Sequence, residues 1–96
     1  MINVTYIKVH WKHNFLDEPI LLFSELDDKR NEIRKVEVFR DELMGYAEGK
    51  ISKNGTFLSE CELPELSVIN EDSQFEGFEL SKDEFESIWE KAINKK

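Results

Sequence analysis

The sequence predicts an α+β fold, in which an antiparallel sheet of about five strands packs against a C-terminal helix and a shorter helix. Two apolar segments separated by five polar residues predict a β-hairpin at the centre of the chain. A helix-start pattern followed by apolar residues at helical spacing predicts the C-terminal helix. Because 96 residues are too few for two ordinary domains, we expect a single domain over residues 1–96.

Residues 33–40 alternate apolar and charged side chains, which is typical of a strand. The preceding segment, residues 20–26, is nearly continuous in apolar residues, as expected for a strand covered on both faces. If the loop between the two strands comprises all five polar residues, 27–31, then Leu22 faces Val36 on the core side, and Phe23 faces Lys35 on the other side. A slip of one residue would exchange the two faces, so this register is a testable expectation.

A first strand is expected over residues 4–11, with Thr5, Ile7, Val9 and Trp11 facing the core. The later elements are shorter. They are a strand over 44–47, a small hairpin whose Asn54-Gly55 turn separates Ile51 from Phe57, a short helix that starts at Pro64 and ends at Asn70 with Leu66 and Ile69 on its buried side, and a strand over 75–80.

Ser81 and Glu84 form a capping-box pattern, and Leu80 with Phe85 fits a hydrophobic staple. Apolar residues then recur at helical spacing, which predicts one buried helix face. They are Phe85, Ile88, Trp89, Ala92 and Ile93.

The chain has a net charge of −8, and the excess lies in its second part. Residues 1–40 contain seven Lys or Arg and seven Asp or Glu, whereas residues 41–96 contain six and fourteen. This balance repels phosphate backbones and so argues against nucleic acid as a partner. It favours a basic protein partner, although an acidic surface also serves solubility alone.

Cysteine usage and apolar run length indicate the compartment. The single Cys61 cannot form an internal disulfide, and the first residues lack a signal-peptide pattern, so we expect a cytoplasmic protein. The apolar runs are far shorter than the roughly 20 residues that a membrane helix needs, so no membrane span is expected.

Several segments resemble a family of small bacterial proteins of unknown function. They are Tyr6-Ile7-Lys8-Val9-His10-Trp11, Asp17-Glu18-Pro19, Ser24-Glu25-Leu26-Asp27, Arg34-Lys35-Val36-Glu37-Val38-Phe39-Arg40-Asp41 and Gly45-Tyr46-Ala47, together with the spacing of Phe85 and Trp89. The resemblance implies no catalytic residue, ligand or cofactor. Small acidic bacterial proteins of this kind are similar to immunity proteins, which neutralise a toxin by binding it.

No catalytic signature, phosphate-binding loop or cofactor motif is present. His10, His13 and the Asp17-Glu18 pair could supply metal ligands, but their spacing fits no strong motif, and we predict no metal site. Cys61 lies between two glutamates whose charges oppose thiolate formation, which argues against a nucleophile.

Two surfaces are therefore the candidate sites for a partner. The first is the sheet face opposite the expected core, unless the terminal helix or residues 41–60 cover it. It comprises Tyr6, Lys8, His10, Phe23, Lys35 and Glu37. The second is acidic and comprises Glu60, Glu62, Glu65, Glu71 and Asp72.

We expect a protein-binding domain that is not an enzyme. More specifically, we expect an immunity-like inhibitor of a basic, nuclease-type toxin. The alternative is a small-ligand-binding or enzymatic domain, which a mostly apolar pocket with convergent polar groups would favour.

Overall fold

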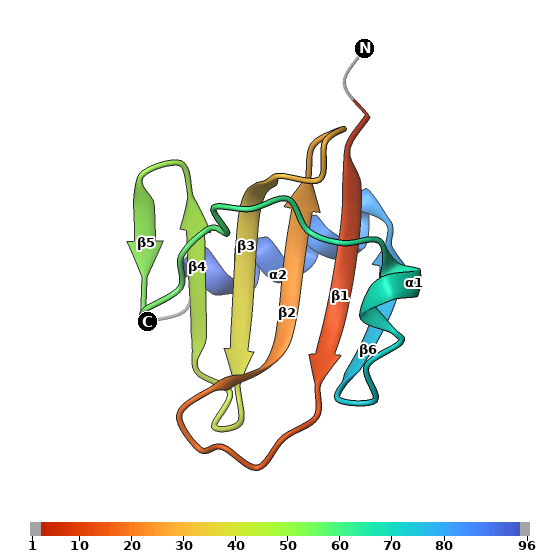
Figure 1. Cartoon of the computed structure of the whole chain (residues 1–96). Helices are drawn as coiled ribbons and strands as arrows, with labels where there is room; N and C mark the ends of the chain where they lie inside the picture. The colour runs from red at the N-terminus through yellow and green to blue at the C-terminus, as the bar shows by residue number, and fades with distance from the viewer. Residues whose placement is uncertain (1–2, 95–96) are drawn as a thin grey trace.

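A computed structural model describes residues 3–94 of the chain as one six-stranded antiparallel sheet with two helices (Figure 1). The strand order is β5-β4-β3-β2-β1-β6. This confirms the predicted α+β class, with one strand more than expected. The elements are β1 (Thr5–Trp11), β2 (Pro19–Leu26), β3 (Glu32–Phe39), β4 (Met44–Glu48), β5 (Ile51–Lys53), α1 (Leu66–Ile69), β6 (Phe75–Leu80) and α2 (Lys82–Asn94).

The sheet is covered differently on its two faces. Helix α2 lies across one of them, here called the helix face (Figure 1). Residues 57–72, which include α1, cross the other side, here called the pocket face. No helix within residues 3–94 is long and apolar enough to cross a membrane.

The β2–β3 hairpin has the expected five-residue loop, since Leu26 pairs with Glu32 across it. The predicted register is nevertheless wrong from Glu25 to Leu21, and a second irregularity at Ile20 restores it where Pro19 pairs with Phe39. An irregularity at Ile33 shifts the pairing by one residue, so that Phe23 lies opposite Val36. The local reason is a β-bulge, in which an extra residue on one strand opposes no partner.

The bulge decides which side chains share a face. Residues three apart on a regular strand point to opposite sides, because side chains alternate. With Ile33 inserted, Glu32 and Lys35 both lie on the pocket face, where their side chains are 3.6 Å apart. Arg34 and Val36 instead face α2. The β3 strand therefore contributes Glu32 and Lys35 to the pocket face, and Arg34 with the apolar Val36 to the helix face.

The core on the helix face consists of Phe23, Val36, Met44, Phe85, Trp89 and Ala92. Residue Ser81 starts α2 as predicted: the Ser81 N–H donates to Glu84 Oε1 at 2.9 Å, and the Glu84 N–H donates to Ser81 Oγ at 3.1 Å. The predicted stripe is confirmed at its buried positions, but Ile93 is 42% exposed and lies outside the core.

The core on the pocket face is smaller. Ile7, Val9 and Leu26 are buried there, with Leu63, Leu66, Ile69 and Phe75 packed against them. The face of β1 predicted to lie in the core is thus buried at Ile7 and Val9, but against residues 57–72 and not against α2.

Two local predictions need correction. Asn54 and Gly55 have the expected positive φ angles of 56° and 79°, yet no strand follows them. Strand β5 instead pairs antiparallel with the preceding strand, β4, and a turn at Gly49 and Lys50 joins the two. Helix α1 begins at Leu66 with Glu65 as its N-cap, so Pro64 lies outside it.

Candidate functional site

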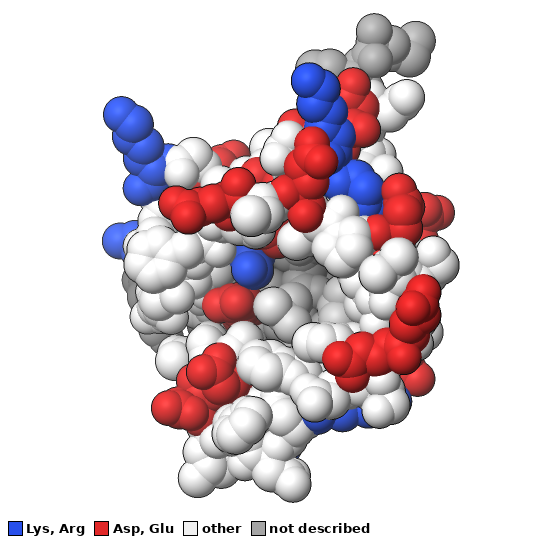
Figure 2. Space-filling model, viewed as in Figure 1, with Lys and Arg blue, Asp and Glu red and all other residues white. Residues whose placement is uncertain are grey.

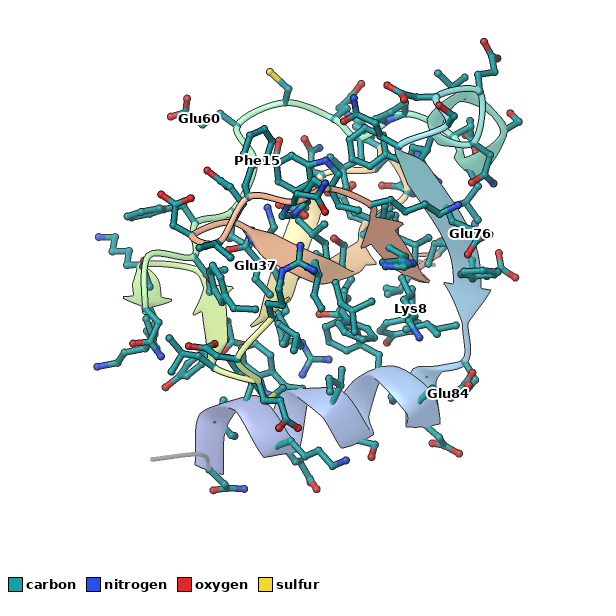
Figure 3. All side chains as sticks on the ribbon, turned by 90° about the horizontal axis from the view of Figure 1, so that it is seen from below. Lys8, Phe15, Glu37, Glu60, Glu76 and Glu84 are labelled. Carbon is teal, nitrogen blue, oxygen red and sulfur yellow. The ribbon has the colours of Figure 1, made fainter. Side chains whose placement is uncertain are left out.

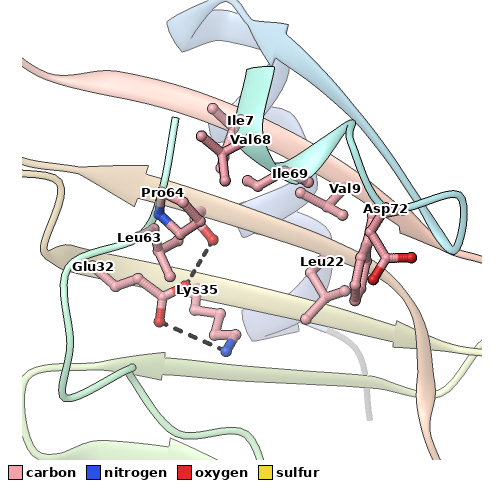
Figure 4. A pocket seen from close by; sticks show the side chains of 12 residues that line it. Ile7, Val9, Leu22, Glu32, Lys35, Leu63, Pro64, Val68, Ile69 and Asp72 are labelled. Carbon is pink, nitrogen blue, oxygen red and sulfur yellow. Dashed lines mark hydrogen bonds and ion pairs between the residues drawn. The ribbon is translucent and has the colours of Figure 1, made fainter. Parts of the chain in front are cut away.

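A pocket of about 330 Å³ opens on the pocket face, between the sheet and residues 57–72 (Figure 4). Its lining is mostly apolar and comes from β1, β2, β3, β6, α1 and the segments on either side of α1. Figure 2 shows this face hollowed, with mostly uncharged side chains around the hollow, one basic and one acidic group at its side, and further acidic residues around it. The lining residues are Ile7, Val9, Leu22, Ser24, Glu32, Lys35, Leu63, Pro64, Val68, Ile69, Asp72 and Phe75.

One end of the pocket is polar, because the side chain of Glu32 lies there almost fully buried. Ser24 Oγ donates to Glu32 Oε2 at 2.8 Å, and the backbone N–H of Ser59 donates to Glu32 Oε1 at 2.6 Å. These bonds satisfy a carboxylate that would otherwise be costly to bury. They also tie residues 57–72 to the sheet.

Lys35 stands between two carboxylates at the same end. Its Nζ is 3.6 Å from Glu32 Oε1 and 3.8 Å from Glu37 Oε2, while Thr56 Oγ1 donates to Glu37 Oε1 at 2.8 Å. Both ion-pair distances exceed those of a hydrogen bond. Among residues 3–94, Lys35 Nζ therefore makes ion pairs without a hydrogen bond, and its N–H donors remain available to a bound group.

Arg30 fixes the wall of the pocket. Its guanidinium donates to the carbonyl oxygens of Leu63 and Pro64 at 2.9 and 2.8 Å, and the Leu63 N–H donates to the Arg30 carbonyl at 2.8 Å. Arg30 has a φ of 67°, a left-handed conformation that is uncommon for this residue type. The pocket is therefore formed by contacts within the chain and needs no ligand to open it.

The five acidic residues predicted from the sequence lie on the segment that forms one wall of this pocket. All five are exposed and lie on residues 57–72, a segment that contains no Lys or Arg. Asp72 itself lines the pocket, and Glu65 forms an ion pair with Arg30 at 3.5 Å. The residues are Glu60, Glu62, Glu65, Glu71 and Asp72, here called the acidic rim.

The other predicted surface is not a single surface. Tyr6, Lys8, His10 and Phe23 lie on the helix face, whereas Lys35 and Glu37 lie on the pocket face. The physical reason is again the bulge at Ile33, which changes the pairing of β2 with β3. Phe23 is buried under α2, so it cannot contact a partner. Lys8 lies over its ring at 5.8 Å. Figure 3 shows Lys8 and Glu37 on separate parts of the sheet.

A charged network on the helix face connects the sheet to α2. Arg34 donates to both carboxylate oxygens of Glu25 and to both of Glu86, at 2.6 to 2.9 Å. Its guanidinium also lies 5.0 Å from the Phe85 ring centre and 5.1 Å from that of Trp89. The bonds to Arg34 lower the pKa of Glu86. These groups satisfy one another, which indicates a structural role.

Burial raises the pKa of the Tyr6 hydroxyl, and its hydrogen bond to Glu25 adds to the rise. Tyr6 also packs on Phe85, with ring centres 5.2 Å apart. Tyr6 thus belongs to the interior between β1 and α2.

The His10, His13, Asp17 and Glu18 side chains form no metal site. Within residues 3–94, no group of three or more His, Cys, Asp or Glu side chains could hold a metal ion. His13 instead accepts the Phe15 N–H at Nδ1, at 3.0 Å, so its Nε2 donates to the Pro19 carbonyl at 2.7 Å. Figure 3 shows Phe15 at this end of the sheet.

Sequence reasoning missed most of the pocket. It placed Ile7 and Val9 in the core, and it did not single out Ser24, Glu32 or Val68. The available signal was the absence of Lys and Arg from residues 57–72 beside five acidic residues and several apolar ones.

The fold and the pocket define a small α+β domain with an antiparallel sheet and an acidic, pocketed face. Residues 5–94 match the family described as a domain of unknown function, DUF6881, and the chain belongs to that family. Comparison with curated proteins and with solved structures gave no match.

Proposed function

We propose that this chain is a protein-binding domain that receives a basic partner on the pocket face. The observation that supports this proposal is the acidic rim beside an apolar pocket. Negative charge draws a basic partner over distance and speeds encounter, whereas apolar contacts in a pocket slow dissociation. The rim and the pocket together supply both contributions on one face.

The finer version of the proposal is an immunity-like inhibitor of a basic, nuclease-type bacterial toxin. Such a toxin is cationic because it binds nucleic acid, so an acidic face complements its substrate site. An assay of the partner's nuclease activity with and without this chain tests this version. Loss of activity at a one-to-one ratio supports it, and unchanged activity of a bound partner overturns it.

The main experiment measures association kinetics with a purified partner, first identified by affinity capture, at two salt concentrations. Replacing Glu60, Glu62 and Glu65 together with Gln is expected to slow association and to flatten its salt dependence. Folding is expected to survive, since exposed charges contribute little to stability.

A matched control removes the same charge elsewhere. Glu48, Glu79 and Glu90 are exposed and lie outside the acidic rim, so their joint replacement with Gln changes the net charge equally. A smaller effect of this control supports the proposed face. Equal effects of the two triple variants, or unchanged rates for both, overturn it.

A second candidate function is the binding of a small molecule. The pocket favours it, because it is mostly apolar and has Ser24, Glu32 and Lys35 converging at one end. Native mass spectrometry of the chain purified from its own cells tests this candidate. A small molecule that co-purifies with the wild-type chain but not with Val68→Trp would support small-molecule binding over a protein partner.

A further inference from the structure

We propose that the pocket takes one apolar side chain of the partner and that Lys35 donates a hydrogen bond to a backbone carbonyl of the same partner segment. This inference rests on the proposed function and defines the partner's chemistry: an apolar residue flanked by basic residues. Three features of the pocket support it, namely its apolar lining, its free donor and its charged margin.

The lining selects an apolar group. Ile7, Val9 and Leu22 form the floor from the sheet, and Leu63 and Ile69 form the facing wall. An apolar side chain that enters this space leaves water at roughly 25 cal/mol for each Å² that it buries. The bonds of Arg30 to the wall keep the pocket formed before binding, which limits the entropy lost on association.

The donor selects a neutral acceptor. Lys35 keeps its N–H groups available, because its carboxylate neighbours lie beyond hydrogen-bond distance. Glu32 and Glu37 carry more negative charge than the one ammonium group offsets. A carboxylate from a ligand would meet this excess and be repelled, whereas a peptide carbonyl can accept from Lys35 without adding charge.

The acidic residues at the edge of the pocket favour particular residues on either side of the partner's apolar residue. Asp72 lies at one side of the pocket, and Glu62 and Glu65 flank its Leu63-Pro64 wall. A peptide backbone that leaves the pocket in either direction passes exposed carboxylates. Lys or Arg on both sides of the apolar residue therefore complements the surface.

The test uses three short peptides, each acetylated and amidated, as probes. Their sequences are Lys-Lys-Leu-Lys-Lys, Lys-Lys-Ala-Lys-Lys and Glu-Glu-Leu-Glu-Glu, and binding is followed by amide and methyl NMR shifts of the full chain. The leucine peptide with lysines is expected to bind roughly tenfold or more tightly than the alanine peptide, because it buries three more carbon atoms. Its shifts should centre on Val9, Leu63 and Ile69, and the glutamate peptide should not bind.

Two variants of pocket residues and one control variant locate the effect. Val68 lines the pocket and is 51% exposed, so Val68→Trp fills the space without removing a core residue. It is expected to abolish the preference for leucine over alanine. Ile93→Trp adds a similar bulk at an exposed position on α2 and should leave that preference unchanged. Lys35→Met is expected to weaken the binding of the leucine peptide severalfold.

Equal affinities of the leucine and alanine peptides, or leucine-peptide shifts that centre outside the pocket, overturn this inference. So does a preference for leucine that persists in Val68→Trp. These outcomes do not contradict the proposed function if neutralising the acidic rim still slows the association of a protein partner. The proposed function fails separately, if rim neutralisation has no more effect than the control triple variant.

Discussion

The side-chain amide of Asn70 pairs with the backbone of Gly77 at the outer edge of the sheet. Gly77 N–H donates to Asn70 Oδ1 at 2.6 Å, and Asn70 Nδ2 donates to the Gly77 carbonyl at 3.3 Å. Strand β6 is an edge strand, so these backbone groups lie where another strand could pair. Asn70 thus occupies one pairing position of the exposed edge.

Asn70→Ala is expected to lower the free energy of unfolding by about 1–3 kcal/mol, the net value of two hydrogen bonds, and to increase self-association through β6. Urea denaturation and light scattering measure the two effects. Asn14→Ala, at another exposed asparagine, is the control. Equal stability of the two variants would show that the edge pairing contributes nothing.

Trp89 is expected to be the most costly position on α2. Its ring contacts Tyr46 edge-on at 5.4 Å and stacks with Phe85 at 6.4 Å. Trp89→Ala should therefore destabilise by about 3–5 kcal/mol, through lost burial and a cavity. Ile93→Ala on the exposed side of the same helix should cost far less, and chemical denaturation compares them. A loss below about 1 kcal/mol at Trp89 would contradict the core assignment.

Ser81→Ala tests the capping box separately. It is expected to cost about 0.5–2 kcal/mol, because the Glu84 N–H loses its acceptor. Ser87 is exposed within α2, where alanine has the higher helix propensity, so Ser87→Ala should be neutral or stabilising. Thermal and urea unfolding measure both variants, and a loss at Ser81 as large as at Trp89 would contradict the ranking.

Arg34→Met is expected to destabilise by about 3–5 kcal/mol at neutral pH, since Glu25 stays buried without its cation. The loss should depend on pH through Glu86. Because Arg34 lowers the folded pKa of Glu86, this contribution is present above the unfolded value of about 4.5 and disappears as pH falls through the lower folded pKa. The difference between wild type and variant should therefore shrink below about pH 4.5. Denaturation at several pH values checks this, and a constant difference would contradict it.

Local patterns were sufficient to predict most elements. The capping box at Ser81, the five-residue loop after Leu26 and the helical spacing of Phe85 and Trp89 each depend on residues close in sequence. Such signals act within one turn or one hairpin, so an isolated sequence contains them.

The pocket could not be predicted, because it depends on distant segments. Residues 57–72 cover the sheet through contacts such as Arg30 with Leu63, which lie 33 positions apart. The exposed acidic rim was found from composition. That Glu32 and Lys35 lie together on the pocket face follows only from the bulge at Ile33, and nothing in the alternation of residues 33–40 indicates an inserted residue.

Deleting Ile33 tests the bulge directly. Without it, alternation alone would place Glu32 on the pocket face, Arg34 on the helix face and Lys35 on the pocket face. Ile33 is 37% exposed, so its removal takes little from the core. We therefore expect the deletion variant to fold, with a loss of about 1–2 kcal/mol and unchanged shifts around the Arg34 network.

Deleting Lys35 is the matched comparison. It also removes one residue from β3, and Val36 can keep its position opposite Phe23 if the bulge closes. Arg34 would then turn to the pocket face, and Glu25 would lose its partner, at a cost of about 3–5 kcal/mol. Urea denaturation of the two deletion variants, with NMR of the Arg34 side chain, measures the difference. If deletion of Ile33 costs as much as deletion of Lys35, the inserted residue is required for the pairing itself, and its role is not only to select faces.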